Sequence, residues 1–310
     1  MTALICGSMA YDTVMVFAGR FREQILPDRI HMLNVSFLVP TLKRNFGGCA
    51  GNIAYNVKLL GGNGLPMATV GSDFGPYARW LESCGIDSSR LRTLDDEYTA
   101  QAFITTDLDD NQITAFHPGA MNRSHVNVVP TDAGITLGVI APDGRDGMLQ
   151  HATQFTAAGI PILFDPGQGL PMFDGAELRQ FVRSARWVAV NDYEGTMLSE
   201  RTGMSHQEIA RDLDALIVTR GASGSVIHAN GREIVIPAAK PAAVVDPTGC
   251  GDAYRAGLLY GIMQGRDWET TGRVASLMGA IKIAHAGTQE HRFTLPEFRQ
   301  QYRAAFGSEL

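Results

Sequence analysis

The most informative stretch of this sequence is Asp246-Pro247-Thr248-Gly249-Cys250-Gly251-Asp252-Ala253-Tyr254-Arg255-Ala256-Gly257. Two of its glycines flank one residue directly before Asp252–Met263, a segment predicted to be a helix. Glycine permits positive φ and lets a ligand approach the backbone closely. The free N–H groups and the dipole at a helix start attract anions, so we expect Gly249, Cys250 and Gly251 to form an anion site. There the thiolate of Cys250 would also be favoured.

Asp252 stands in the first turn of this predicted helix, so its carboxylate would lie beside the anion site. A carboxylate beside an anion site is explained if the carboxylate acts as a base. A hydroxyl held between Asp252 and a γ-phosphate would lose its proton to Asp252 during phosphoryl transfer. The alternative is a tight turn followed by an aspartate that the helix dipole stabilises. Both interpretations stay open on this stretch alone.

A second glycine-rich stretch is Phe46-Gly47-Gly48-Cys49-Ala50-Gly51-Asn52, which precedes an amphipathic helix over Ala50–Leu60. Here Gly47 and Gly48 would let a substrate lie against the chain, where Asn52 could hydrogen-bond to it. Close packing of the helix on a strand would serve equally well as an explanation.

A carboxylate follows the first predicted strand, in Gly7-Ser8-Met9-Ala10-Tyr11-Asp12. In doubly wound folds, ligands bind beyond the carboxyl ends of the strands. There Asp12 could accept hydrogen bonds from the two hydroxyls of a ribose, with Ser8 beside it. The alternative for Asp12 is a turn cap.

Two further segments follow predicted strands. In Asn191-Asp192-Tyr193-Glu194, Asn191 and Glu194 could order magnesium-bound water near phosphates, or could simply begin a helix. In Thr219-Arg220-Gly221-Ala222-Ser223-Gly224, the glycines predict a turn against a nucleotide, although many hairpins have the same pattern.

Short apolar runs alternate with helical segments along most of the chain, which predicts an α/β fold with a parallel sheet covered by helices on both faces. The predicted strands are Thr2–Cys6, Met67–Val70, Thr136–Ile140, Ile160–Phe164, Trp187–Val190 and Leu216–Thr219. The predicted C-terminal helices, after the one at Asp252, are Thr270–His285 and Leu295–Phe306.

One region departs from this alternation. Thr99–Thr106 and Asn111–His117 flank a turn at Asp107–Asp110 and predict an antiparallel hairpin, which Thr13–Phe17 and Val35–Val39 would extend. A four-residue turn would set Phe103 and Phe116 on one face, where they could stack on a purine. They could equally pack onto the body or a second subunit. We expect residues 1–310 to form a single domain with a small β-sheet lid from about 13–40 and 97–118.

Composition, charge and cysteine spacing limit the partners and the compartment that we expect for this protein. Hydrophobic residues make up 45% and charged residues 19%, and the net charge is −6. With a pI near 5.7, neither nucleic acid nor a membrane surface is an expected partner. The four cysteines are scattered, and no signal peptide is evident, so we expect a reducing cytoplasm. The P-loop and dinucleotide-binding fingerprints do not occur in the sequence.

Taken together, these motifs resemble the ribokinase (PfkB carbohydrate kinase) family. The Gly47–Asn52 stretch, the Asn191–Glu194 segment and the Asp246–Asp252 stretch match its pattern in order and spacing. Within the family, His117-Pro118-Gly119-Ala120-Met121 and Tyr254-Arg255-Ala256-Gly257 are similar to segments of bacterial adenosine kinases. Departures are Gln168-Gly169, where relatives often have two glutamines, and His117, where they have tyrosine.

The resemblance implies a three-layer α/β/α ribokinase-like fold and assigns a role to each segment. Asp252 would be the base beside the anion hole of Gly249, Cys250 and Gly251. The remaining roles would be nucleoside binding by Ser8, Asp12, Gly47, Gly48, Asn52, Phe103, Phe116 and Gln168, ATP binding by Asn191, Thr219, Gly221 and Gly224, and magnesium binding by Glu194.

We therefore expect an ATP- and Mg²⁺-dependent kinase that phosphorylates the 5′-hydroxyl of a purine nucleoside, most favourably adenosine. Other purine nucleosides (inosine or guanosine) and sugars such as ribose or fructose are the alternative substrates. A non-catalytic nucleoside-binding regulator is the alternative from another class. Activation by K⁺ and assembly into a homodimer stay open.

Overall fold

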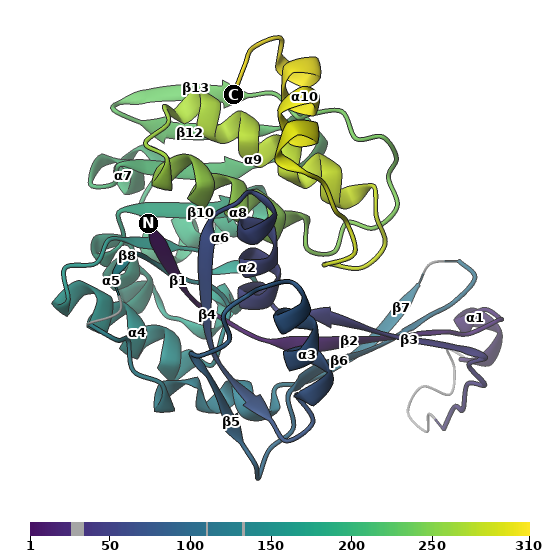
Figure 1. Ribbon diagram of the computed structural model, residues 1–310. Coiled ribbons are helices and arrows are strands. Elements are labelled where there is room, and N and C mark those ends of the chain that lie inside the picture. Colours follow the sequence, from purple (N-terminus) through teal and green to yellow (C-terminus); the bar gives the residue numbers. More distant parts are fainter. Residues whose placement is uncertain (26–33, 110, 132–133) are drawn as a thin grey trace.

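The computed structural model describes residues 1–25, 34–109, 111–131 and 134–310. A nine-stranded sheet runs through its centre in the order β13-β12-β11-β10-β9-β8-β1-β4-β5 (Figure 1). All neighbours from β11 to β5 are parallel, whereas β12 and β13 add antiparallel strands at one edge. The strands are β1 (Thr2–Cys6), β4 (Asn63–Gly71), β5 (Leu91–Leu94), β8 (Ile135–Ile140), β9 (Ile162–Phe164), β10 (Trp187–Asn191), β11 (Ala215–Thr219), β12 (Ser225–Ala229) and β13 (Arg232–Ile236).

Alternate residues of β1 enter two separate cores. Ala3 and Ile5 belong to one cluster, and Leu4 and Cys6 to the other, because successive strand side chains point to opposite faces. The first face is covered by α2 (Cys49–Leu59), α3 (Gly75–Ser83), α8 (Cys250–Met263) and α9 (Trp268–Ile283), with α10 (Leu295–Phe306) packed on α9. The second is covered by α4 (Arg145–Ala157), α5 (Gly175–Ser184), α6 (Asp192–Thr202) and α7 (His206–Arg211). The predicted three-layer α/β/α fold is confirmed.

A second sheet, called the small sheet below, projects from the body (Figure 1). Its order is β3-β2-β6-β7. The strands are β2 (Ala10–Val16), β3 (Thr41–Gly47), β6 (Ala100–Thr106) and β7 (Gln112–His117). The predicted antiparallel hairpin of β6 and β7 is confirmed. Of the predicted lid segment 13–40, residues 26–33 lie outside the described residues.

The predicted strand at Val35–Val39 is wrong, since these residues are irregular and β3 begins at Thr41. In β3 the chain pairs with β2 along its whole length and leads directly into the glycines before α2. Phe37 instead packs its ring against Phe17 and Phe21, with centroid distances of 4.9 and 5.0 Å.

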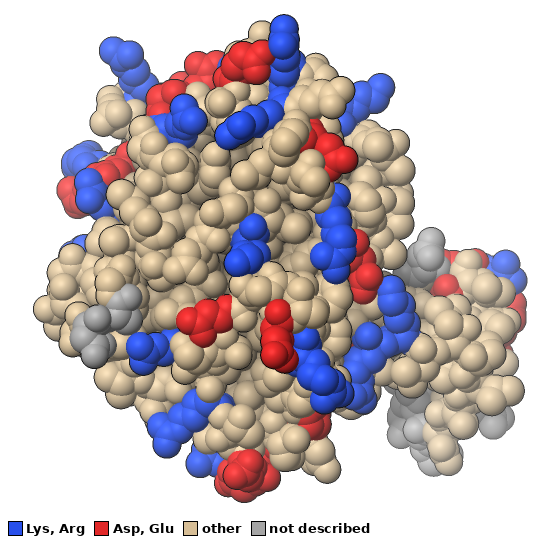
Figure 2. Space-filling view, in the orientation of Figure 1, with Lys and Arg blue, Asp and Glu red and all other residues tan. Residues whose placement is uncertain are grey.

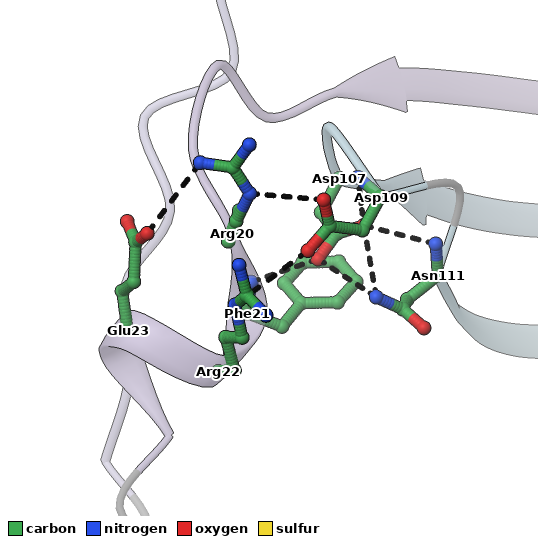
Figure 3. A network of polar contacts seen from close by, with 7 residues as sticks. All are labelled: Arg20, Phe21, Arg22, Glu23, Asp107, Asp109 and Asn111. Carbon is green, nitrogen blue, oxygen red and sulfur yellow. Dashed lines mark hydrogen bonds and ion pairs between the residues drawn. The ribbon is translucent and has the colours of Figure 1, made fainter.

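The tip of the small sheet is fixed by one carboxylate (Figure 3). Asp107 accepts backbone N–H bonds from Phe21 (2.9 Å), Asp109 (3.0 Å) and Asn111 (2.9 Å). Burial opposes the effect, but these donors lower the pKa of Asp107 to about 2. Because Asn111 is drawn into this turn, five residues rather than the predicted four join β6 to β7.

Basic and acidic side chains are interspersed over the face shown in Figure 2. Among the described helices, none has the length and apolar character needed to span a bilayer.

Candidate active site

A cavity of about 1370 Å³ lies at the carboxyl ends of the central strands and reaches the small sheet. Most residues that the sequence singled out line it. They are Ser8, Asp12, Gly48, Asn52, Phe116, Gln168, Asn191, Glu194, Thr219, Gly221, Gly224, Gly249, Cys250, Gly251 and Asp252. Two predicted substrate-binding residues, Gly47 and Phe103, are not in this lining.

The predicted anion site has the expected backbone. Gly249 is the N-cap of α8 with φ +78°, and the helix begins at Cys250, two residues earlier than predicted. The N–H of Cys250 donates to Pro247 O at 3.2 Å. By contrast, the N–H groups of Gly251 and Asp252 make no hydrogen bond to another described residue. Two donors at a helix start are thus available to an anion.

Asp252 lies in the first turn of α8 and keeps part of its surface open to the cavity. Its Oδ2 accepts a hydrogen bond from Asn52 Nδ2 at 2.8 Å. Desolvation raises the pKa of Asp252 to about 7, against the opposing effect of the Asn52 hydrogen bond. A carboxylate with a pKa near neutrality is suited to proton transfer.

Sequence reasoning missed the residues that hold Asn52. Gln289 Nε2 donates to Asn52 Oδ1 at 3.0 Å and also contacts the Tyr77 hydroxyl at 2.6 Å. Gln289 Oε1 in turn accepts from Trp80 Nε1 at 2.8 Å. This relay, which is buried at its centre, runs from Trp80 to Asp252, and no local pattern near position 289 could have revealed it.

Asp12 follows the first strand as predicted, and it faces the cavity from β2 of the small sheet. Burial, followed by the negative charge of Asp246, raises the pKa of Asp12 to about 6. Gly47 lies directly beside it, since a Cβ there would come within 2.5 Å of Asp12 Oδ2. Gly47 therefore makes room for Asp12 without lining the cavity. Ser8 Oγ accepts the N–H of Cys49 at 3.1 Å, which fixes the start of α2.

The prediction that Phe103 and Phe116 share a face is wrong. In the β6–β7 ladder Phe116 pairs with Ala102, and Phe103 pairs with Ala115. Paired residues share a face and successive residues alternate, so the longer turn puts the two rings on opposite sides. Phe116 lines the cavity, whereas Phe103 lies on the outer face and is 40% exposed.

Asn191 and Glu194 form a capping box at the start of α6, with reciprocal bonds of 2.8 Å. The helix-start interpretation of this segment is therefore confirmed, although both residues also line the cavity. Burial is the main reason that the pKa of Glu194 is raised. Within the described parts of the chain, no cluster of three His, Cys, Asp or Glu residues could hold a metal by itself.

The cavity wall contains a buried ion pair that the sequence did not reveal, although one of its members, Arg255, belongs to the Asp246–Gly257 stretch. Arg255 donates from Nε and Nη2 to both oxygens of Asp165, at 3.0 and 2.9 Å, and its Nη2 lies 3.8 Å from Glu194 Oε2. It thus joins α8 to the segment that carries Gln168.

The prediction that the thiolate of Cys250 is favoured is wrong. Burial raises the pKa of this thiol to about 11, which outweighs the positive charge of Lys282 nearby.

Comparisons with known proteins show the family and the fold to which this chain is similar. The family model described as pfkB family carbohydrate kinase matches residues 8–294. A nucleoside kinase of Methanocaldococcus jannaschii is 33% identical over 258 residues, which are 83% of this chain and 85% of that protein. The structure of Burkholderia thailandensis nucleoside kinase in complex with inosine superposes with a TM-score of 0.90 at 52% identity and covers 99% of each chain. Its complex with ADP-inosine gives a TM-score of 0.88 at 54% identity, over 99% of this chain and 97% of that one.

Proposed function

The chain belongs to the pfkB family of carbohydrate kinases, and from this premise we propose that it is a nucleoside kinase that transfers the γ-phosphoryl group of ATP to the 5′-hydroxyl of a purine nucleoside, with adenosine preferred. Similarity to nucleoside kinases over most of the chain favours a nucleoside over a free sugar. The known complexes with inosine and with ADP-inosine belong to the Burkholderia relative and support a cavity that holds both ligands.

One observation carries the proposal: the Asp252 carboxylate, whose pKa burial raises to about 7, lies beside two N–H groups at a helix start that donate to no other described residue. Asp252 would accept the proton of the 5′-hydroxyl as the phosphoryl group leaves ATP. The N–H groups of Gly251 and Asp252 would stabilise the charge that spreads over the transferred group. A non-catalytic nucleoside-binding protein does not need a proton acceptor beside an anion site, so this pairing favours a kinase.

At the nucleoside end, we assign the ribose hydroxyls to Asp12 and Asn52, with Ser8 and Gly48 beside them in the cavity wall. Phe116 would stack on the base, and Gln168 would face its edge. Since an amide can turn to donate or accept, Gln168 could serve either adenosine or inosine. The small sheet would close over the nucleoside as a lid of a single 1–310 domain and exclude water.

At the other end, Thr219, Gly221 and Gly224 would contact ATP, with Asn191 near its phosphates. Glu194 fits a magnesium role because its carboxylate reaches the cavity and can hold metal-bound water with the phosphates. When bound, Mg²⁺ would neutralise charge on the β- and γ-phosphates. Through its contacts with Asp165 and Glu194, Arg255 would hold Glu194 at a fixed distance from the start of α8.

Measurement of kcat/KM with ATP for adenosine, inosine, guanosine, ribose and fructose tests the proposal. We expect adenosine to lead the other purine nucleosides by roughly 10–200-fold, because stacking and one amide select bases weakly. A higher value for ribose or fructose would transfer the assignment to the sugar kinases. No ATP consumption with any acceptor would leave only a binding protein.

A further inference from the structure

Lys282, near the end of α9, is completely buried, and its ammonium is surrounded by oxygen atoms. Its Nζ donates to Asp246 O at 2.7 Å and to His285 O at 3.1 Å, and lies 3.9 Å from Asp246 Oδ2. A lysine is almost never buried fully unless its charge is matched. Burial lowers the pKa of Lys282, and the charge of Asp246 acts in the opposite direction.

Asp246 is the first residue of the segment that forms the anion site. Its Oδ1 accepts the N–H of Thr248 at 2.9 Å, and its Oδ2 accepts the N–H of Gly287 at 2.8 Å. The Lys282 ammonium therefore ties the end of α9 to the segment leading to Gly249, and Asp246 in turn ties that segment to the turn at Gly287. The positive charge of Lys282 also acts on Cys250, the first residue of α8.

Two carbonyl oxygens and a carboxylate around one point would also suit an alkali cation, because carbonyl oxygens replace the hydration shell of K⁺ in proteins. Here the ammonium of Lys282 already occupies that point with the same charge. An ion bound there would have to displace a side chain that is covalently attached.

We propose that Lys282 is a built-in cation that positions the anion-site segment through Asp246, so that this kinase does not need K⁺. The proposal rests on the function proposed above and predicts that K⁺ does not activate the enzyme. Lys282 does not line the cavity, so it is a positioning residue that acts through the backbone of the 246–252 segment and through its charge.

The first experiment uses the unmodified protein. Turnover of adenosine and ATP is followed by direct chromatography of the products, in buffers whose only monovalent cation is K⁺, Na⁺ or choline. We expect kcat to agree within about twofold across the three, because a covalently attached ammonium needs no bound ion. A kcat that collapses in choline and returns with K⁺ would overturn the proposal.

The second experiment removes the ammonium with Lys282→Met, which keeps much of the side-chain volume. We expect kcat to fall by about 10–100-fold, the usual cost of losing a group that orients an active-site residue. We also expect KCl or methylammonium, but not choline, to restore part of the loss. Lys58→Met, at an exposed position on α2, is the matched control and should change nothing. A Lys282→Met enzyme that keeps full activity in choline would contradict the proposal.

A third variant separates a folding defect from a loss of function. Lys282→Arg keeps the charge, so it should stay active without K⁺ even if Lys282→Met fails to fold. If the unmodified protein turns over no acceptor, the proposed function fails, and ADP binding by thermal shift then becomes the readout. In that case K⁺ should strengthen ADP binding to Lys282→Met but not to the unmodified protein, and any other result overturns the role of Lys282.

Discussion

Asn52 Nδ2 donates a 2.8 Å hydrogen bond to Asp252 Oδ2, although 200 residues separate the two positions in the chain. The bond exists because α2 and α8 cover the same face of the central sheet, and each begins just after a glycine with positive φ. The proposed base and the residue that orients it therefore come from the two glycine-rich stretches.

Replacement of Asp252 by Asn should lower kcat by about 10²–10⁴-fold, because the 5′-hydroxyl loses its proton acceptor. ADP affinity and melting temperature should be retained, since Asn is also tolerated near a helix N-terminus. Steady-state kinetics and ADP titration of the variant decide the matter. Turnover close to normal would remove Asp252 from the mechanism.

The pH dependence follows from the raised pKa of Asp252. A base must be ionised to act, so kcat/KM should rise with pH and level off above about 7, the pKa of this carboxyl in the free protein. Below that pH, kcat/KM should fall nearly tenfold for each pH unit. An ordinary aspartate would keep the rate flat down to about pH 5. A flat profile between pH 5 and 7 would therefore contradict the assignment.

Gln289→Leu should act on catalysis from a distance. The substitution removes the donor to Asn52 and leaves Trp80 Nε1 without its acceptor, so Asn52 is free to turn away from Asp252. We expect a fall in kcat of about 10–100-fold with little change in ADP affinity. Gln300→Leu, on the exposed side of α10, is the matched control. Equal kinetics for the two variants would show that the relay has no part in catalysis.

Asp12→Ala should weaken nucleoside binding by roughly 1.5–3 kcal/mol, which is the worth of a hydrogen bond to a charged group. ADP binding should be unaffected, because Asp12 belongs to the small sheet and not to the proposed ATP end of the cavity. Calorimetric titration of both ligands separates the two effects. Equal losses for adenosine and ADP would point to a general structural defect in place of ribose recognition.

The two phenylalanines of the small sheet provide an internal comparison. Phe116→Ala should raise the KM for adenosine by about 5–150-fold, since base stacking on an aromatic side chain is worth about 1–3 kcal/mol. Phe103→Ala lies on the opposite face and should leave this KM unchanged. If Phe103→Ala had the larger effect, the pairing of β6 with β7 would have to differ from that described.

The sequence was sufficient to predict the layers and the hairpin, and most of the site residues that it singled out do line the cavity, because these features depend on local patterns. Glycines before a helix, apolar runs of strand length and polar residues after strands each leave a signal within a few positions. The carboxyl ends of parallel strands meet at one edge, so such signals converge on one site.

The errors came from interactions between distant segments. The register of β6 and β7 depends on Asp107 holding the N–H of Asn111 and of Phe21, which adds one residue to the turn. Gln289 and Lys282 are single polar residues without a neighbouring motif, and only the packed structure reveals what they contact. The strand placed at Val35–Val39 failed because pairing with β2, rather than side-chain preference, selects β3.

The cavity wall is divided between the small sheet and the helices of the body, and this division can be used in protein engineering. Ala102, Thr114 and Phe116 face the cavity from alternate positions of β6 and β7, whereas Asp252 and its partners belong to the helices of the body. A library that varies only these three positions would alter the shape offered to the acceptor and leave the proton-transfer groups untouched. New acceptor ranges could thus be selected without rebuilding the phosphoryl-transfer machinery.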